Sequence, residues 1–301
     1  MYADDSQLYS ILKSYSCVDQ EASIEQLQQC ICEISDWMNR NDLKLNDDKT
    51  EFVIVGTAKQ RAKMLFDSIR VGDVDIKSSP CVRNLGVLID AELTMKNQVN
   101  AICKSCYHHI RNIRLIRPYL SISAAKTIVH SVISSRLDYC NAVLIGISEH
   151  LIKKLQRVQN SAARLVLNLN RYDSISTALI SLHWLPVKER IAYKINVMVF
   201  KALTGESPGY IVDMLELSDP PRNLRSSLKK NTLKEKKSKL VTMGDRAFSI
   251  AAPKFWNSLP DDIRNIEQSI DVFKQKLKTF LFRKAFKSTN LSVQEGNKLP
   301  I

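Results

Sequence analysis

The sequence is poor in the residues that build loop-rich or irregular chains. It has 8 Gly and 9 Pro in 301 residues, so neither a loop-rich β-sandwich nor a disordered chain is expected. Its 7 Cys are an odd number, scattered along the chain. No secretory signal opens the sequence, and no apolar run reaches the roughly 20 residues of a membrane span. We therefore expect no membrane partner and a reducing, intracellular location, in the nucleus or the cytoplasm.

The sequence does have enough apolar residues for a core and a large, uneven excess of positive charge. Hydrophobic residues make up 45% of it, enough for one or two cores, and helices should dominate. Residues 1–90 contain 10 Lys/Arg and 15 Asp/Glu, whereas residues 91–301 contain 34 and 16. Such a basic rear part indicates either a polyanionic partner, most commonly nucleic acid, or a solvated basic surface.

The first 90 residues predict a mixed α and β segment. Apolar residues recur at three- and four-residue steps from Ile24 to Met38, which predicts one helix. Strands are expected at 6–11 and at 51–55, the latter ending at Gly56, and a hairpin at 69–76. One further strand is expected at 82–89.

The remainder predicts a helical protein. Helical apolar faces run from Val99 to Ile113, from Ser121 to Tyr139, from Leu151 to Leu165 and from Pro186 to Ala202. Four amphipathic helices with short connections indicate a bundle. Residues 206–240 are Pro-containing and basic, which predicts a linker or an arm. An apolar, aromatic segment at 248–259 and a last helix around Ile270–Leu281 follow it.

A pair of adjacent carboxylates, Asp4-Asp5, stands near the start of the sequence. Nucleotidyl transfer uses two divalent ions held by carboxylates, one ion to activate the attacking hydroxyl and one to neutralise the leaving pyrophosphate. A bare Asp-Asp is more typical of a surface turn. Its neighbours therefore decide how it is interpreted.

Three segments in a fixed order resemble the reverse transcriptases of non-LTR retrotransposons, of the LINE-type, jockey-like form. Residues 2–9, Tyr-Ala-Asp-Asp-Ser-Gln-Leu-Tyr, resemble the Tyr-Ala-Asp-Asp box of that family. Residues 43–51, with Leu-Lys-Leu-Asn and Lys-Thr-Glu, resemble the next motif, and residues 83–90 resemble the hairpin motif after it. Further segments similar to the family's region after the palm are 138–141, 151–163, 182–187, 244–248, 252–260 and 273–282.

The resemblance implies an α+β, mostly helical fold with a partial palm sheet and one flanking helix, then a helical thumb bundle and a C-terminal helical region. The expected divisions are a partial palm at 1–92, a thumb-like bundle at 93–205, a basic linker at 206–240, a C-terminal helical region at 241–287 and a frayed tail at 288–301.

The resemblance also implies roles for individual residues. Asp4 would be a metal ligand for Mg²⁺ with Asp5 beside it, Lys49 a candidate general acid, and Leu85-Gly86 the turn that grips the primer. An RNA template and a DNA primer would be the partners. The family's fingers and its first palm aspartate precede the Tyr-Ala-Asp-Asp box, where this sequence has only Met1, so we expect no polymerase activity from this chain alone.

A dense basic run within 222–239 is the second candidate site. It can hold phosphates, in which case binding would weaken steeply with salt, or it can be a disordered charged linker or a nuclear-localisation signal. Its cations are Arg222, Arg225, Lys229, Lys230, Lys234, Lys236, Lys237 and Lys239.

Two other clusters have plain structural interpretations. Cys103, Cys106, His108 and His109 carry metal-binding side chains, but helix spacing makes a cysteine-lined helix seam the preferred interpretation. Two of the three tryptophans, Trp184 and Trp256, could stack on bases, but their apolar neighbours predict core packing.

Three hypotheses therefore stay open. The chain is part of an RNA-directed DNA polymerase of a mobile element, or a non-catalytic, basic, helical protein that binds nucleic acid. The third hypothesis is a decayed fragment whose helix face at Ile24–Met38 lacks its partners and which aggregates.

Overall fold

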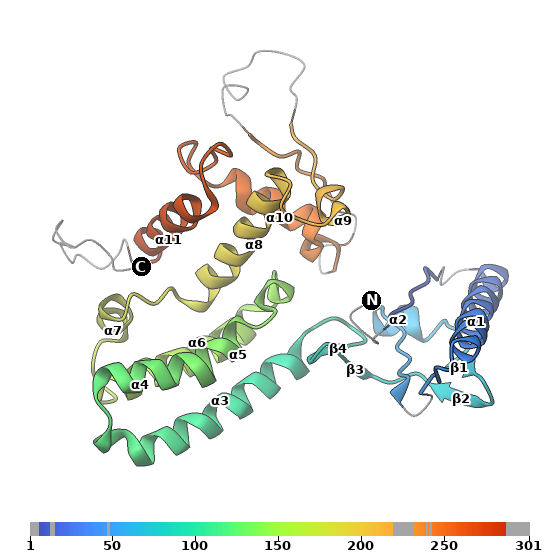
Figure 1. Ribbon diagram of the computed structural model, residues 1–301, viewed down its shortest axis with the longest axis horizontal. Helices are drawn as coiled ribbons and strands as arrows, with labels where there is room; N and C mark the ends of the chain where they lie inside the picture. Colours follow the sequence, from blue (N-terminus) through green and yellow to red (C-terminus); the bar gives the residue numbers. More distant parts are fainter. Residues whose placement is uncertain are drawn as a thin grey trace. The chain divides into compact units, whose positions relative to one another are not determined.

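The computed structural model of the protein describes residues 6–12, 16–46, 49–218, 231–238, 240 and 243–286. The chain forms two compact units, residues 1–98 and residues 99–301. Helices predominate in the described residues, and two small antiparallel hairpins supply the strands of the named sheets (Figure 1). The coarse expectation of a mostly helical α+β chain is thus confirmed.

The first unit combines one long helix with the two hairpins. Its helices are α1 (Cys17–Arg40) and the one-turn α2 (Ala58–Arg61). The hairpins pair β1 (Ser68–Val71) with β2 (Val74–Lys77), and β3 (Cys81–Asn84) with β4 (Val87–Asp90). Helix α1 packs against β1, and the residues of its predicted apolar face, Ile24, Leu27, Ile31, Ile34 and Met38, are half-buried, none of them fully.

Three strand predictions in this unit need correction. The predicted single strand at 82–89 is a hairpin, because the chain turns at Leu85-Gly86. The predicted strand at 51–55 makes only one bridge, between Phe52 and Ser78. There the Ser78 hydroxyl accepts the backbone N–H of Ile54, so a side chain takes the place of a ladder partner. The predicted strand at 6–11 is irregular backbone.

The second unit is helical, and most of α3 belongs to it. Helix α3 begins in the first unit. The elements in chain order are α3 (Lys96–Ile116), η2 (Arg117–Tyr119), α4 (Ile122–Val129), η3 (His130–Ser134), α5 (Ser135–Asp138), η4 (Asn141–Leu144), α6 (Glu149–Leu167), α7 (Ile175–Ser181), α8 (Val187–Leu203), α9 (Gly209–Val212), η6 (Gly244–Arg246), α10 (Phe248–Asn257) and α11 (Ile270–Phe286).

The prediction of helices in these four segments is confirmed by α3, by the α4–η3–α5 segment, by α6 and by α8. The apolar face of α3 is buried as predicted, from Val99 to Ile113. Ser121 caps α4 through its hydroxyl, which accepts the N–H of Ala124 at 3.1 Å. Helix α4 continues through the π-helical turn η3 into α5 and packs against α6 (Figure 1).

The buried face of this α4–η3–α5 segment differs from the prediction by one residue. Its buried residues recur at four-residue steps, whereas the predicted inward residues Ile128 and Val132 are only half-buried. A π-helical turn has more residues per turn than an α-helix, so four-residue spacing stays on one side. The buried apolar residues are Ala125, Val129, Ile133 and Leu137.

Helix α8 forms the centre of the C-terminal core and packs against α10 and α11. The Phe200 and Phe273 rings stack with their centroids 4.3 Å apart, and Trp256 lies 5.8 Å from Phe273. The Trp256 indole N–H donates to the carbonyl of Asn231 at 2.7 Å. The core assignment of Trp256 is therefore confirmed. Trp184 is also buried, edge-on to His130.

Part of the predicted linker is ordered against α10. Leu217 and Leu233 form an antiparallel bridge, and Leu233 is buried. The Asn257 side chain accepts the N–H of Leu233 and donates to its carbonyl, at 2.9 and 2.8 Å. The predicted tail at 288–301 lies outside the described residues.

Candidate nucleic-acid interface

The predicted catalytic carboxylates, Asp4 and Asp5, lie outside the described residues. Lys49, the candidate general acid, is exposed, and its backbone N–H donates to the carbonyl of Asn46 at 3.2 Å. Among the residues that the structure describes, no three His, Cys, Asp or Glu side chains form a group able to hold a metal ion.

The predicted primer-grip residues form the tip of the β3–β4 hairpin. Leu85 and Gly86 have φ values of 44° and 81°, so both central residues of this two-residue turn are left-handed. Such turns match the twist of the flanking strands, but they favour Asn or Gly at the first position. Leu85 instead holds a branched apolar side chain there, 46% exposed. A left-handed leucine costs about 1–2 kcal/mol, and strain of this kind is often retained at functional sites.

The three segments that carry the resemblance meet at this hairpin. The Asn84 side-chain amide donates to the side-chain oxygen of Gln7 at 2.8 Å, which joins the hairpin to the residues after the Asp pair. The backbone N–H of Arg83 donates to the carboxylate of Glu51 at 2.9 Å. Glu51 follows Lys49 by two residues in the sequence. The two contacts join residues that are 77 and 32 positions apart in the sequence, so local sequence patterns cannot predict them.

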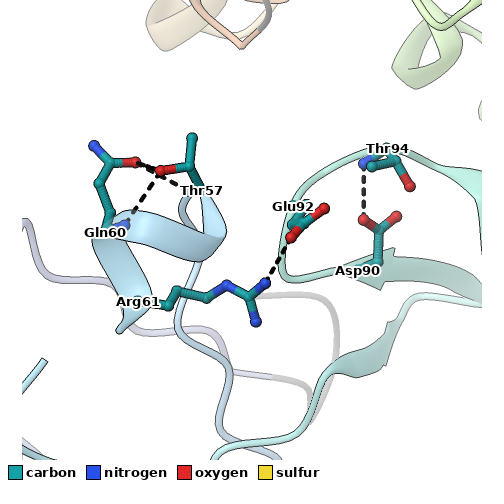
Figure 2. A network of polar contacts seen from close by, with 6 residues as sticks. All are labelled: Thr57, Gln60, Arg61, Asp90, Glu92 and Thr94. Atoms are coloured by element: carbon teal, nitrogen blue, oxygen red, sulfur yellow. Dashed lines mark hydrogen bonds and ion pairs between the residues drawn. The ribbon is translucent and has the colours of Figure 1, made fainter. Parts of the chain in front are cut away.

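The base of the hairpin is fixed by a polar network (Figure 2). The Asp90 carboxylate accepts the N–H groups of Thr94 and Met95, at 2.8 and 2.7 Å, and so orders the loop before α3. Glu92 in that loop forms a 2.8 Å ion pair with Arg61 of α2. No sequence motif predicts this pairing. Asp90 therefore has a structural role at the place where the hairpin leads into α3.

Helix α3 presents a basic face that was not singled out from the sequence. The helix contains no Asp or Glu, and its exposed positions carry four cations together with polar and aromatic groups. The absence of Asp and Glu from residues 96–116, together with the predicted buried face, is a sequence signal that could have identified this basic face. The exposed residues include Lys96, Asn97, Asn100, Lys104, Tyr107, His108, Arg111, Asn112 and Arg114.

Helix α6 adds further positive charge beside α3. The Lys154 ammonium donates to the Asn100 side chain at 3.2 Å, which brings the start of α6 to the basic face of α3. Lys153 and Arg157 of α6 are exposed. This arrangement suits the phosphate backbone of a nucleic acid, because each neutralised phosphate releases counterions.

The predicted basic run is only partly described, and two of its cations are paired. Lys234 and Lys236 form ion pairs with Glu216, at 3.3 and 2.6 Å, and their hydrogen bonds lower the pKa of that carboxyl. Lys237 is exposed. The other members lie outside the described residues: Arg222, Arg225, Lys229, Lys230 and Lys239.

The cysteines of α3 line the packed side of the helix. Cys106 is fully buried, and burial raises the pKa of its thiol to about 12. Burial also raises the pKa of Cys103. Metals bind the thiolate form, which such surroundings disfavour. His108 points away from this seam and is exposed.

The family-like segments of the helical unit hold one another in place. Asp138 pairs with Arg190, whose guanidinium also donates to the carbonyl of Leu185 at 3.0 Å. The side-chain amide of Gln159, buried in α6, donates to the same carbonyl at 2.8 Å. Gln156, one turn earlier, accepts the N–H of Val187 at 2.9 Å. Asp138, Gln156 and Gln159 therefore stabilise the packing between helices and the backbone at the start of α8.

Comparisons with known proteins add no relative to this picture. Neither the scan against protein-family models nor the searches of curated proteins and of solved structures returned a match. Within the described part of the chain, no helix is both long and apolar enough to cross a membrane.

Proposed function

We propose that this chain is the end of the palm and the thumb of a non-LTR retrotransposon reverse transcriptase, and that it binds a primer–template. The observation that carries the proposal is the meeting of three motif segments at one hairpin. Gln7, Glu51 and the turn at Leu85-Gly86 come from the three segments that resemble the family. Their order and spacing support a common origin with that family.

In this proposal the hairpin tip contacts the primer end and the basic face of α3 contacts the phosphate backbone. Leu85 is exposed and has a positive φ, a costly conformation that is often retained at functional sites. This favours a role for the hairpin tip in contacting a ligand. The cations of α3 lie along a helix without competing carboxylates. Asp4 and Asp5 remain the proposed ligands for Mg²⁺ in nucleotidyl transfer, and Lys49 the proposed acid.

The α3 contact is tested with the full chain and a fluorescent DNA primer on an RNA template. Anisotropy at several salt concentrations gives the affinity and its salt slope. The variant Lys104→Gln with Arg111→Gln should lower the slope by about 2, because each lost phosphate contact changes it by about 1. The matched control, Lys276→Gln with Arg283→Gln, removes the same charge from exposed positions of α11 and should leave the slope unchanged.

The hairpin contact is tested by comparing a primer with a recessed 3′ end and a blunt duplex of the same length. The variant Leu85→Asn suits the left-handed turn and removes the apolar tip. We expect it to abolish the preference for the recessed end and to leave blunt-duplex binding intact. An unchanged preference would contradict the proposed primer grip.

The second candidate is a non-catalytic protein that binds nucleic acid through its basic helices. The acid-free face of α3 favours it, because that face requires no hairpin. This candidate predicts that the α3 variant weakens binding while the wild-type chain shows no preference for a recessed end. If neither probe binds in a salt-dependent way, both candidates fail.

A further inference from the structure

One end of the helical unit exposes an unusual group of large apolar side chains. Tyr119 and Tyr172 are 88% and 93% exposed, and Leu115 and Ile122 are 74% and 56% exposed. Single exposed apolar residues are ordinary on protein surfaces, but a cluster of this size marks an interaction site. We call these four residues the tyrosine tip.

The tip brings together segments far apart in the sequence. Arg117 of η2 donates to the carbonyls of Leu165 and Val166 in the last turn of α6, at 2.8 and 2.7 Å. Tyr119 follows Arg117 in η2, and Tyr172 lies in the loop that leaves α6. The two segments that carry these tyrosines, η2 and the loop between α6 and α7, therefore lie at the same end of the helical unit (Figure 1).

The two segments that carry the tip have an excess of positive charge. Residues 111–126 contain four Lys/Arg and no acid, and residues 168–173 contain Arg171 and Asp173. The Asp173 carboxylate accepts the N–H of Asn170 at 2.6 Å, so it is engaged within its own loop. Arg114 and Arg171 are exposed, and they directly precede Leu115 and Tyr172 in the sequence.

We propose that the tyrosine tip binds a single-stranded nucleic acid, whose bases stack on Tyr119 and Tyr172 while Arg114 and Arg171 contact its phosphates. Aromatic rings beside cations are the combination that holds unpaired strands, because every base has a face to stack and its backbone is anionic. A second copy of the chain fits less well, since it would bring the same cations against each other. This site rests on the proposed function, and it would bind an unpaired strand in addition to the primer–template duplex.

The test uses the full chain and a fluorescein-labelled, twelve-nucleotide oligo(dT). Each stacked base contributes roughly fivefold or more in affinity, so Tyr119→Ala with Tyr172→Ala should raise the Kd about 25-fold. The variant Tyr119→Phe with Tyr172→Phe keeps the rings and should bind like the wild type. Tyr119→Leu with Tyr172→Leu keeps the apolar surface without the rings and should bind like the alanine variant.

Two controls make the outcome decisive. Tyr210→Ala removes another exposed tyrosine, in α9, and should leave the Kd unchanged. The tip variants should bind a blunt duplex like the wild type, so that failure of the tip and failure of the proposed duplex interface are separately visible. Equal oligo(dT) affinity for the alanine variant and the wild type overturns the inference. Full affinity of the leucine variant overturns it too, as does binding to anionic vesicles that is lost with the tyrosines while oligo(dT) binding stays.

Discussion

Arg117 offers the sharpest test of how the helical unit is held together. Its guanidinium donates to three carbonyls, those of Leu165, Val166 and Leu120, at 2.8, 2.7 and 2.8 Å. Two of them belong to the last turn of α6, where carbonyls lack helical partners and a cation also interacts favourably with the helix dipole. Replacing Arg117 by Met keeps much of the apolar stem and removes all three donors.

The expected loss follows from these contacts. A hydrogen bond to a charged group contributes about 1.5–3 kcal/mol when it is well buried. Arg117 is half-buried, so water can replace part of each contact. We therefore expect Arg117→Met to lower the free energy of unfolding by about 3 kcal/mol in total, less than the full sum of three such bonds. In a unit of this size, that corresponds to a Tm lowered by about 6–12 °C.

The assay is urea unfolding followed by tryptophan fluorescence in a Trp37→Phe background. The other two tryptophans, Trp184 and Trp256, are buried in the second unit, so the signal reports on that unit alone. Arg114→Met is the matched control, because Arg114 is an exposed arginine of α3 and should change stability by less than about 0.5 kcal/mol. If the two variants differ by less than that amount, the Arg117 contacts do not stabilise the unit and our reasoning is wrong.

Three further predictions concern contacts named above. Asp90→Ala should cost about 1–2 kcal/mol and speed hydrogen exchange at the two backbone amides that it caps. Gln159→Leu alone should cost about 1 kcal/mol, because Arg190 still donates to the Leu185 carbonyl; adding Arg190→Met should cost more than the two single changes together in a double-mutant cycle. Partial desolvation of the largely exposed His130, helped by nearby cations, lowers its pKa below the ordinary 6.5, so the unfolded state binds more protons and stability should fall as the pH drops below about 6.5. Urea titrations of the wild type and His130→Gln between pH 5 and 8 measure this, and equal slopes would exclude it.

The helices were predictable because their signal is local. The buried side of α3 follows the three- and four-residue spacing from Val99 to Ile113, and Ser121 caps α4 by the ordinary chemistry of its hydroxyl. The short helices α2, α7 and α9 were missed, since four to seven residues carry too little periodicity. The π-helical turn at 130–134 was missed too, because its wider turn is set by packing against α6.

The hairpin at 81–90 shows where local signals mislead. Leu85 occupies a position at which Asn or Gly would announce a turn, so an uninterrupted strand was the natural prediction from propensity. Only the family resemblance indicated a hairpin there. The contacts of Asn84 with Gln7 and of Arg83 with Glu51 join residues that no periodicity connects, and they had to come from the fold.

The same contrast bears on which residues deserve functional tests. Several family-like residues of the helical unit are committed to structure: Asp138 pairs with Arg190, and Gln156 and Gln159 hold the backbone that enters α8. Changing them would weaken the proposed nucleic-acid binding only by unfolding the unit, so they cannot separate one proposed function from the other. The exposed residues of the hairpin tip, of α3 and of the tyrosine tip can be changed with little cost to the core. A loss of binding caused by a substitution at Leu85, Lys104 or Tyr119 would therefore indicate contact with the ligand. Substitutions on these surfaces can distinguish the polymerase hypothesis from the plain binding hypothesis.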